Sequence, residues 1–147
     1  MKHMIIPDTQ VKPGSSFEHL KWAGQYAVEK KPDVIVHIGD HWDMPSLSSW
    51  DVGKKSFEGR RYVHDVNSGI DGMRAFLDPI REEQKRLIRN KDKRWNPRMV
   101  FCLGNHEQRI QRAIESDAKL EGLIGYDDLM LEEMGWEVHG FLDVVVI

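Results

Sequence analysis

The sequence predicts an α/β fold in which helices are layered against a mostly parallel sheet. Three short apolar runs have the character of buried strands, and they cover residues 4–6, 34–38 and 99–103. Segments long enough to form helices separate the runs, as βαβ units require. Each run also ends in a cluster of polar residues, and the carboxyl ends of parallel strands are where such sheets bind ligands.

The first two helices are predicted from periodicity and from end signals. Residues 17–30 keep one face apolar, with Ser15 or Ser16 as the cap and Pro32 as the stop. Residues 67–90 repeat apolar side chains at steps of three and four, which indicates a second helix, bent at Pro79. Together these helices supply the layer that covers the sheet.

The rest of the chain is predicted to hold shorter elements. Helices are expected over residues 106–118 and 127–134. Two final strands, over 136–139 and 143–147, are expected to form a hairpin around Gly140. A long irregular stretch between residues 41 and 64 separates the second strand from the second helix, and loops of that length in compact domains are usually functional or disordered.

Length and composition indicate a globular protein. A chain of 147 residues suits one domain (residues 1–147), and its 40% hydrophobic and 31% charged residues are ordinary for globular proteins. No apolar stretch approaches a membrane span, and no signal peptide precedes the first strand. The single cysteine, Cys102, lies inside an apolar run, which excludes a disulfide framework and predicts a cytoplasmic location.

The net charge of −3 is unevenly distributed. Residues 81–98 hold eight lysines and arginines against three acids. Such a segment can contact phosphates, which favours a nucleotide or nucleic acid among possible partners. Its alternative explanation is a solvated helix end, where Lys and Arg also suit the helix dipole.

The polar clusters contain the residues that indicate chemistry. They are Asp8-Thr9-Gln10, Gly39-Asp40-His41-Trp42-Asp43 and Gly104-Asn105-His106-Glu107. In order, spacing and residue type they resemble the calcineurin-like metallophosphoesterase superfamily, whose members carry Asp-x-His, Gly-Asp-x-x-Asp and Gly-Asn-His-Glu blocks. Taken singly, each cluster has a plain structural explanation as a turn or a helix cap.

The resemblance implies a layered metallophosphoesterase-like sandwich and a site with two divalent metal ions. Asp40 is the candidate for the carboxylate shared by both ions, because Gly39 allows a sharp turn. Asp8 and Gln10 would join Asp40 at the first ion, and the Asn105 amide oxygen would serve the second. Gln10 stands where the family usually has histidine, so Mn²⁺ or Mg²⁺ is preferred, with Zn²⁺ or iron as alternatives.

Two further residues take catalytic roles by the same resemblance. His106 corresponds to the family histidine that protonates the leaving group or steadies the phosphate, a role that suits an imidazole near neutral pH. Asp43 corresponds to the second aspartate of the second block and would orient His106. His19 and His37 are expected to pack or to lie at the surface, whereas His41 is a possible site contact.

The sequence departs from the family in its last part. The late family histidines, including a Gly-His-x-His turn, are missing, so the chain corresponds to the N-terminal half to two-thirds of a family domain. Three explanations are open: a fragment, a shortened protein with an incomplete site, or a chain completed by a partner. We favour a truncated phosphoesterase similar to phage and bacterial members.

Two functions follow as hypotheses. The first is hydrolysis of phosphomonoesters or phosphodiesters; the second is a non-catalytic binding protein that keeps the fold and has lost the metals. The apolar final residues, 144–147, are expected to pair with another strand or to cause self-association. Loop tryptophans Trp42, Trp50 and Trp95 are candidates for stacking on bases, although such residues more often cover a core edge.

Overall fold

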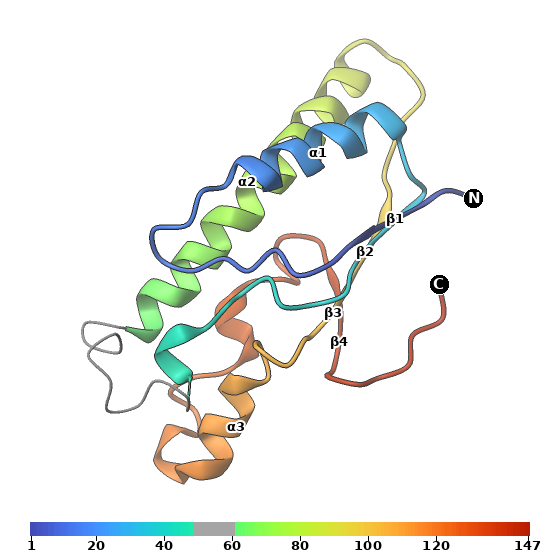
Figure 1. The fold of residues 1–147 in the computed structure, drawn as a ribbon. Coiled ribbons are helices and arrows are strands. Elements are labelled where there is room, and N and C mark those ends of the chain that lie inside the picture. The colour runs from blue at the N-terminus through green and yellow to red at the C-terminus, as the bar shows by residue number, and fades with distance from the viewer. Residues whose placement is uncertain (49–60) are drawn as a thin grey trace.

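A computed structural model describes residues 1–48 and 61–147 (Figure 1). Four strands form one sheet in the order β1-β2-β3-β4, and each neighbouring pair is parallel. The strands are β1 (His3–Ile6), β2 (Val34–His37), β3 (Arg98–Cys102) and β4 (Glu137–His139). The predicted α/β class and the three predicted strands are confirmed.

Two long helices cover one face of the sheet. They are α1 (Glu18–Lys30) and α2 (Tyr62–Arg89), which run side by side in Figure 1. Gly24 lies at their contact, where a Cβ atom would collide with the Phe76 carbonyl oxygen. The absence of a side chain at Gly24 therefore lets the two helix backbones approach closely.

The core lies between these helices and the sheet. Ile35 and Phe101 of the sheet, Leu20 of α1, and Phe76 and Ile80 of α2 are each no more than 1% exposed. Burying a side chain of this size contributes about 1.5–3 kcal/mol relative to exposure, so this layer stabilises the packing of the helices on the sheet.

The helix boundaries show where local signals are sufficient. The first helix starts one residue after its predicted start and ends before Lys31, which is left-handed and precedes Pro32. In contrast, α2 starts at Tyr62 rather than at residue 67. The Tyr62 hydroxyl donates to Asp128 at 2.6 Å and Asp65 accepts from the Ser46 amide at 2.8 Å, so distant contacts extend the helix.

The predicted C-terminal hairpin is wrong. β4 pairs in parallel with β3, and residues 143–147 form no strand. The Asp143 carboxylate accepts a hydrogen bond from the Gly140 amide at 3.0 Å, and the Asp143 amide donates to the Gly140 carbonyl at 3.1 Å. This turn directs the chain away from β4 before a second strand can pair with it.

The elements observed near residues 106–118 and 127–134 are shorter than the helices predicted there. The third helix, α3, spans Arg109–Ser116, because the preceding residues form hydrogen-bonded turns. Instead of a helix over 127–134, a 3₁₀ turn spans Tyr126–Leu129 and stops at the left-handed Met130.

Part of the predicted irregular stretch, residues 49–60, lies outside the described residues, and so does the proposed base contact at Trp50. Trp42 and Trp95 are buried, at 0% and 9% exposure, so neither is available to stack on a base. Among the helices within residues 1–48 and 61–147, none is both long and apolar enough to cross a membrane.

Candidate metal centre

The loops that follow β1 and β2 run alongside each other beyond the strands. Strand register pairs Ile6 with His37, and the pairing continues because the Gln10 amide donates to the Asp40 carbonyl at 2.9 Å. The Val11 amide donates to the His41 carbonyl at 2.6 Å. The backbone therefore fixes the first two polar clusters at the same edge of the sheet.

Three of the predicted metal ligands have left-handed backbone conformations. The φ angles are 33° at Asp8, 48° at Gln10 and 57° at Asp40. Non-glycine residues adopt this region rarely, and they keep it only where surrounding contacts enforce it. Such residues gather at functional sites, so their concentration at one edge of the sheet supports a site there.

Glu107 joins the loop after β3 to the loop after β2. Its buried carboxylate accepts four backbone N–H bonds: from His41 and Trp42 at one oxygen, at 2.8 and 3.0 Å, and from Asp40 and Gly104 at the other, both at 2.9 Å. Burial raises the pKa of Glu107, and the hydrogen bonds from these amides oppose that shift. One side chain thus holds both loops together.

The Asp40 carboxylate lies directly over the third polar cluster. Its Oδ1 accepts a hydrogen bond from the His106 amide at 2.9 Å. A Cβ atom at Gly104 would collide with that same oxygen, so only glycine leaves room for the carboxylate at this place. Asp40 therefore contacts the turn that carries Asn105, its proposed fellow ligand.

His106 is held by the loop that contains Asp43. Its Nδ1 is 2.8 Å from the Asp43 carbonyl oxygen and 3.2 Å from the Asp43 Oδ1. Since a carbonyl can only accept, Nδ1 carries the proton. Arg109 donates to the same Asp43 carbonyl at 2.9 Å, which fixes the loop further. Within the described residues, His106 Nε2 has no hydrogen-bond partner.

The remaining predicted ligands are accessible. Asp8, Gln10 and Asn105 are exposed, and within the described parts of the chain their side-chain oxygens make no hydrogen bond. These three residues and Asp40 all offer oxygen donors, the type of ligand that hard divalent ions such as Mg²⁺ or Mn²⁺ prefer. No group of three or more His, Cys, Asp or Glu residues suited to a metal occurs in residues 1–48 and 61–147.

From the sequence, His37 is expected to pack or to lie at the surface and His41 is a possible site contact, whereas Thr9 has no predicted role. Both histidines are buried and hydrogen-bonded to the Thr9 hydroxyl, so their ring nitrogens are not free to bind a metal. Glu107, in the third polar cluster, braces the loop through its contacts. No local pattern marks Thr9, because its partners lie 28 and 32 residues away.

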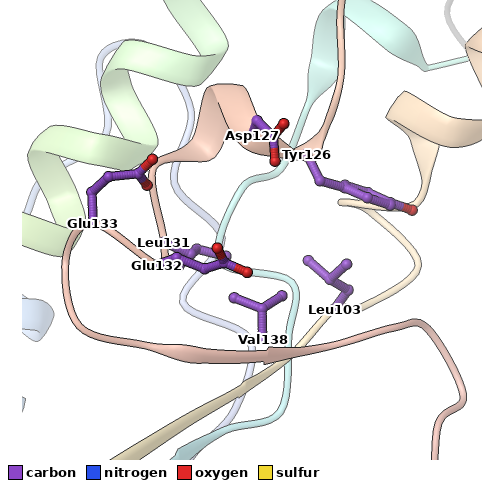
Figure 2. A pocket seen from close by; sticks show the side chains of 7 residues that line it. All are labelled: Leu103, Tyr126, Asp127, Leu131, Glu132, Glu133 and Val138. Atoms are coloured by element: carbon purple, nitrogen blue, oxygen red, sulfur yellow. The ribbon is translucent and has the colours of Figure 1, made fainter.

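Leu103, the residue before the third polar cluster, lines a small acidic pocket of about 50 Å³ (Figure 2). Leu103 and Val138 line its floor, and the carboxylates of Asp127, Glu132 and Glu133 lie around it. A phosphate group would be repelled by these carboxylates. The pocket is therefore not a phosphate subsite.

The basic segment of residues 81–98 is directed away from the candidate centre. It covers the end of α2 and the start of β3, whereas the predicted ligands follow the carboxyl ends of the strands. Arg86 pairs with Glu83 at 2.8 Å, and Arg98 pairs with Glu137 at 2.8 Å. These two cations are thus already engaged in ion pairs.

Comparison with known proteins defines the family. The sequence model of the calcineurin-like phosphoesterase family matches residues 1–145. The chain belongs to the calcineurin-like phosphoesterase family. The parallel sheet and the order of the three polar clusters agree with that assignment.

Two curated phage proteins are similar to part of this chain. The Gene 54 protein of Mycobacterium phage L5 is 37% identical over 79 residues, and that of Mycobacterium phage D29 is 33% identical over 78 residues. The matches cover 54% and 53% of this chain but only 29% of each relative. No solved structure matches the chain significantly.

Proposed function

We propose that this chain carries a metal-dependent phosphoesterase site that hydrolyses phosphomonoesters or phosphodiesters with two divalent ions. The observation that carries this proposal is the junction of three loops at Asp40. Its carbonyl accepts from Gln10, its carboxylate accepts from the His106 amide, and its own amide donates to Glu107. Family membership supplies the reaction class.

Each proposed ligand is assigned to one or both of the two ions. Asp8, Gln10 and Asp40 would hold the first ion, and Asp40 and Asn105 the second. When bound, such ions supply a nucleophilic hydroxide at neutral pH and positive charge against the phosphoryl oxygens. The accessible side-chain oxygens of Asp8, Gln10 and Asn105 support this assignment.

His106 is proposed to protonate the leaving group. Its Nδ1–H bond to the Asp43 carbonyl leaves Nε2 to carry the transferred proton. A doubly protonated ring would give the Nε2 proton to the departing oxygen, and the Asp43 carboxylate, 3.2 Å from Nδ1, would stabilise the positive ring beforehand. Asp43 thus acts by orienting His106.

Replacing Asp40 and His106 should separate metal binding from catalysis. We expect Asp40→Asn to lower both Mn²⁺ affinity and activity about a hundredfold, because one carboxylate serves both ions. We expect His106→Ala to lower kcat about a hundredfold with Mn²⁺ affinity unchanged. Calorimetric titration with Mn²⁺ and hydrolysis of a nitrophenyl phosphodiester measure the two effects. Equal loss of metal in both variants would make His106 a ligand or a structural support.

For the substrate we propose a nucleotide or nucleic acid in a cytoplasmic setting. The basic segment and the candidate centre lie at opposite ends of β3. The basic segment could therefore contribute to substrate binding only if the substrate is a polymer long enough to contact both. Comparing hydrolysis of a mononucleotide with that of a single-stranded oligonucleotide tests the point. A polymer that gains nothing over the mononucleotide would exclude the basic segment from substrate binding.

A second candidate is a non-catalytic binding protein. It is favoured by the shortage of metal-ligating residues, since residues 1–48 and 61–147 contain no cluster of three His, Cys, Asp or Glu suited to an ion. Absence of Mn²⁺ binding in the calorimetric titration would favour this second function. Self-association through residues 144–147 belongs to either proposal; it is supported by the exposure of Val144 and Val146, at 93% and 84%, and is tested by light scattering.

A further inference from the structure

Thr9 occupies an unusual position between two proposed ligands. Its neighbours Asp8 and Gln10 are both exposed and both left-handed, whereas Thr9 is only 9% exposed and directs its hydroxyl into the protein. That hydroxyl is 2.9 Å from His37 Nε2 and 2.6 Å from His41 Nδ1. The Thr9 carbonyl also accepts a bond from His19 Nε2 at 2.9 Å.

The hydrogen bonds at Thr9 run in a single direction. The Gly39 amide donates to His37 Nδ1 at 3.1 Å, so the His37 proton is on Nε2 and is donated to the Thr9 oxygen. At the other end, the Gly69 carbonyl accepts from His41 Nε2 at 2.7 Å. His41 Nδ1 therefore has a free electron pair, which accepts the Thr9 hydroxyl proton.

This relay, defined as Gly39, His37, Thr9, His41 and Gly69, joins four parts of the fold. It connects the end of β2 to the loop after β1, continues to the loop after β2, and ends on α2. Each ring nitrogen and the hydroxyl have a partner. A residue at position 9 without a hydroxyl would leave a buried donor on His37 and a buried acceptor on His41 unpaired.

We propose that Thr9 is a positioning residue for the metal centre: its hydroxyl, fixed between His37 and His41, holds Asp8 and Gln10 in the left-handed conformation that presents both side chains beside Asp40. The proposal rests on the proposed function. The strained conformations require anchoring, and in the three-residue segment from Asp8 to Gln10 only Thr9 has a side chain bonded to the interior.

The test compares Thr9→Val with Thr9→Ser in the full chain. Valine has nearly the shape of threonine but removes the hydroxyl, so the Kd for Mn²⁺ should rise about 10- to 100-fold, as for other groups that orient ligands. Serine keeps the hydroxyl, and its Kd should rise less than about tenfold. Calorimetric titration with Mn²⁺ gives both values without any activity measurement.

A control separates positioning from lost stability. Leu87→Ala, at the distant end of α2, removes buried volume and lowers stability without touching the relay. If Leu87→Ala weakens Mn²⁺ binding as much as Thr9→Val at equal loss of stability, or if Thr9→Val binds like the unmodified chain, the positioning role is overturned. Failure of the unmodified chain to bind Mn²⁺ would instead overturn the proposed function.

A measurement on the unmodified protein keeps the proposal testable should Thr9→Val not fold. Thr9 is the only threonine in the sequence, so a ¹³C-labelled threonine methyl group gives one NMR signal from the relay. Adding Mg²⁺ should shift that signal, and ¹⁵N spectra should show His37 and His41 protonated at Nε2. An unmoved methyl signal in a chain that binds Mg²⁺, or an Nδ1 proton on either ring, would contradict the proposal.

Discussion

Replacing Glu107 by alanine should lower the free energy of unfolding by about 4 kcal/mol, because four backbone N–H groups lose their acceptor at once. These amides lie at Asp40, His41, Trp42 and Gly104, in the interior behind the candidate centre. Water entering the vacated space would recover part of the loss. Urea unfolding at pH 7 measures the change.

Glutamine at position 107 provides a graded comparison. It has nearly the same shape but keeps one oxygen, so two of the four amides face an NH₂ group that cannot accept. The expected loss is about half that of alanine. Glu132→Ala, at an exposed position, should stay within about 0.5 kcal/mol of the unmodified protein. A stable Glu107→Ala protein would show that the two loops are held by other contacts.

Acid should destabilise the protein well before its carboxylates are protonated. Burial lowers the pKa of His41 from 6.5 to about 4, and burial together with His41 lowers the pKa of His37. Between pH 6.5 and about pH 4, His41 of the unfolded chain binds a proton that His41 of the folded chain does not. Stability is therefore complete above pH 6.5 and falls as the pH drops towards 4, by about 3 kcal/mol from His41 alone.

Three glutamates also modify this pH dependence. The raised pKa of Glu107 acts in the opposite sense, since the folded protein takes up that proton first. The pKa values of Glu83 and Glu137, lowered to about 2 by Arg and other cationic neighbours, add a loss below pH 4.5. Urea midpoints at pH 7, 6 and 5 measure the pH dependence. Constant midpoints in the unmodified protein would contradict the expectation.

The sheet could be predicted because its strands carry their own signal. Strands of a parallel sheet are typically continuous apolar runs, as at residues 34–38 and 99–103. These two runs pair with each other in the structure. The order of the polar clusters then predicted which loops would share an edge. The direction of the final strand was missed because no local feature distinguishes a parallel partner of β3 from half of a hairpin.

The contacts that hold the candidate centre had no such signal. Glu107 binds amides 65 to 67 residues away, and Thr9 binds histidines 28 and 32 residues away. Backbone N–H groups are present at every residue except proline, so the sequence does not indicate which of them a carboxylate will meet. Left-handed residues such as Asp8 and Gln10 are equally hidden, because they are imposed by these distant contacts and not by their own preferences.

The hydrogen bonds that Glu107 accepts also determine when the loop after β2 can be fixed during synthesis on the ribosome. The loop after β2 leaves the ribosome with Asp40, but its amides have no acceptor until Glu107 has been made, 67 residues later. At about 5–20 residues per second this interval lasts roughly 3 to 13 seconds. During that time β1, α1 and β2 exist without the contact that closes their polar edge. A nascent chain should therefore become resistant to protease at this edge only after Glu107 has emerged.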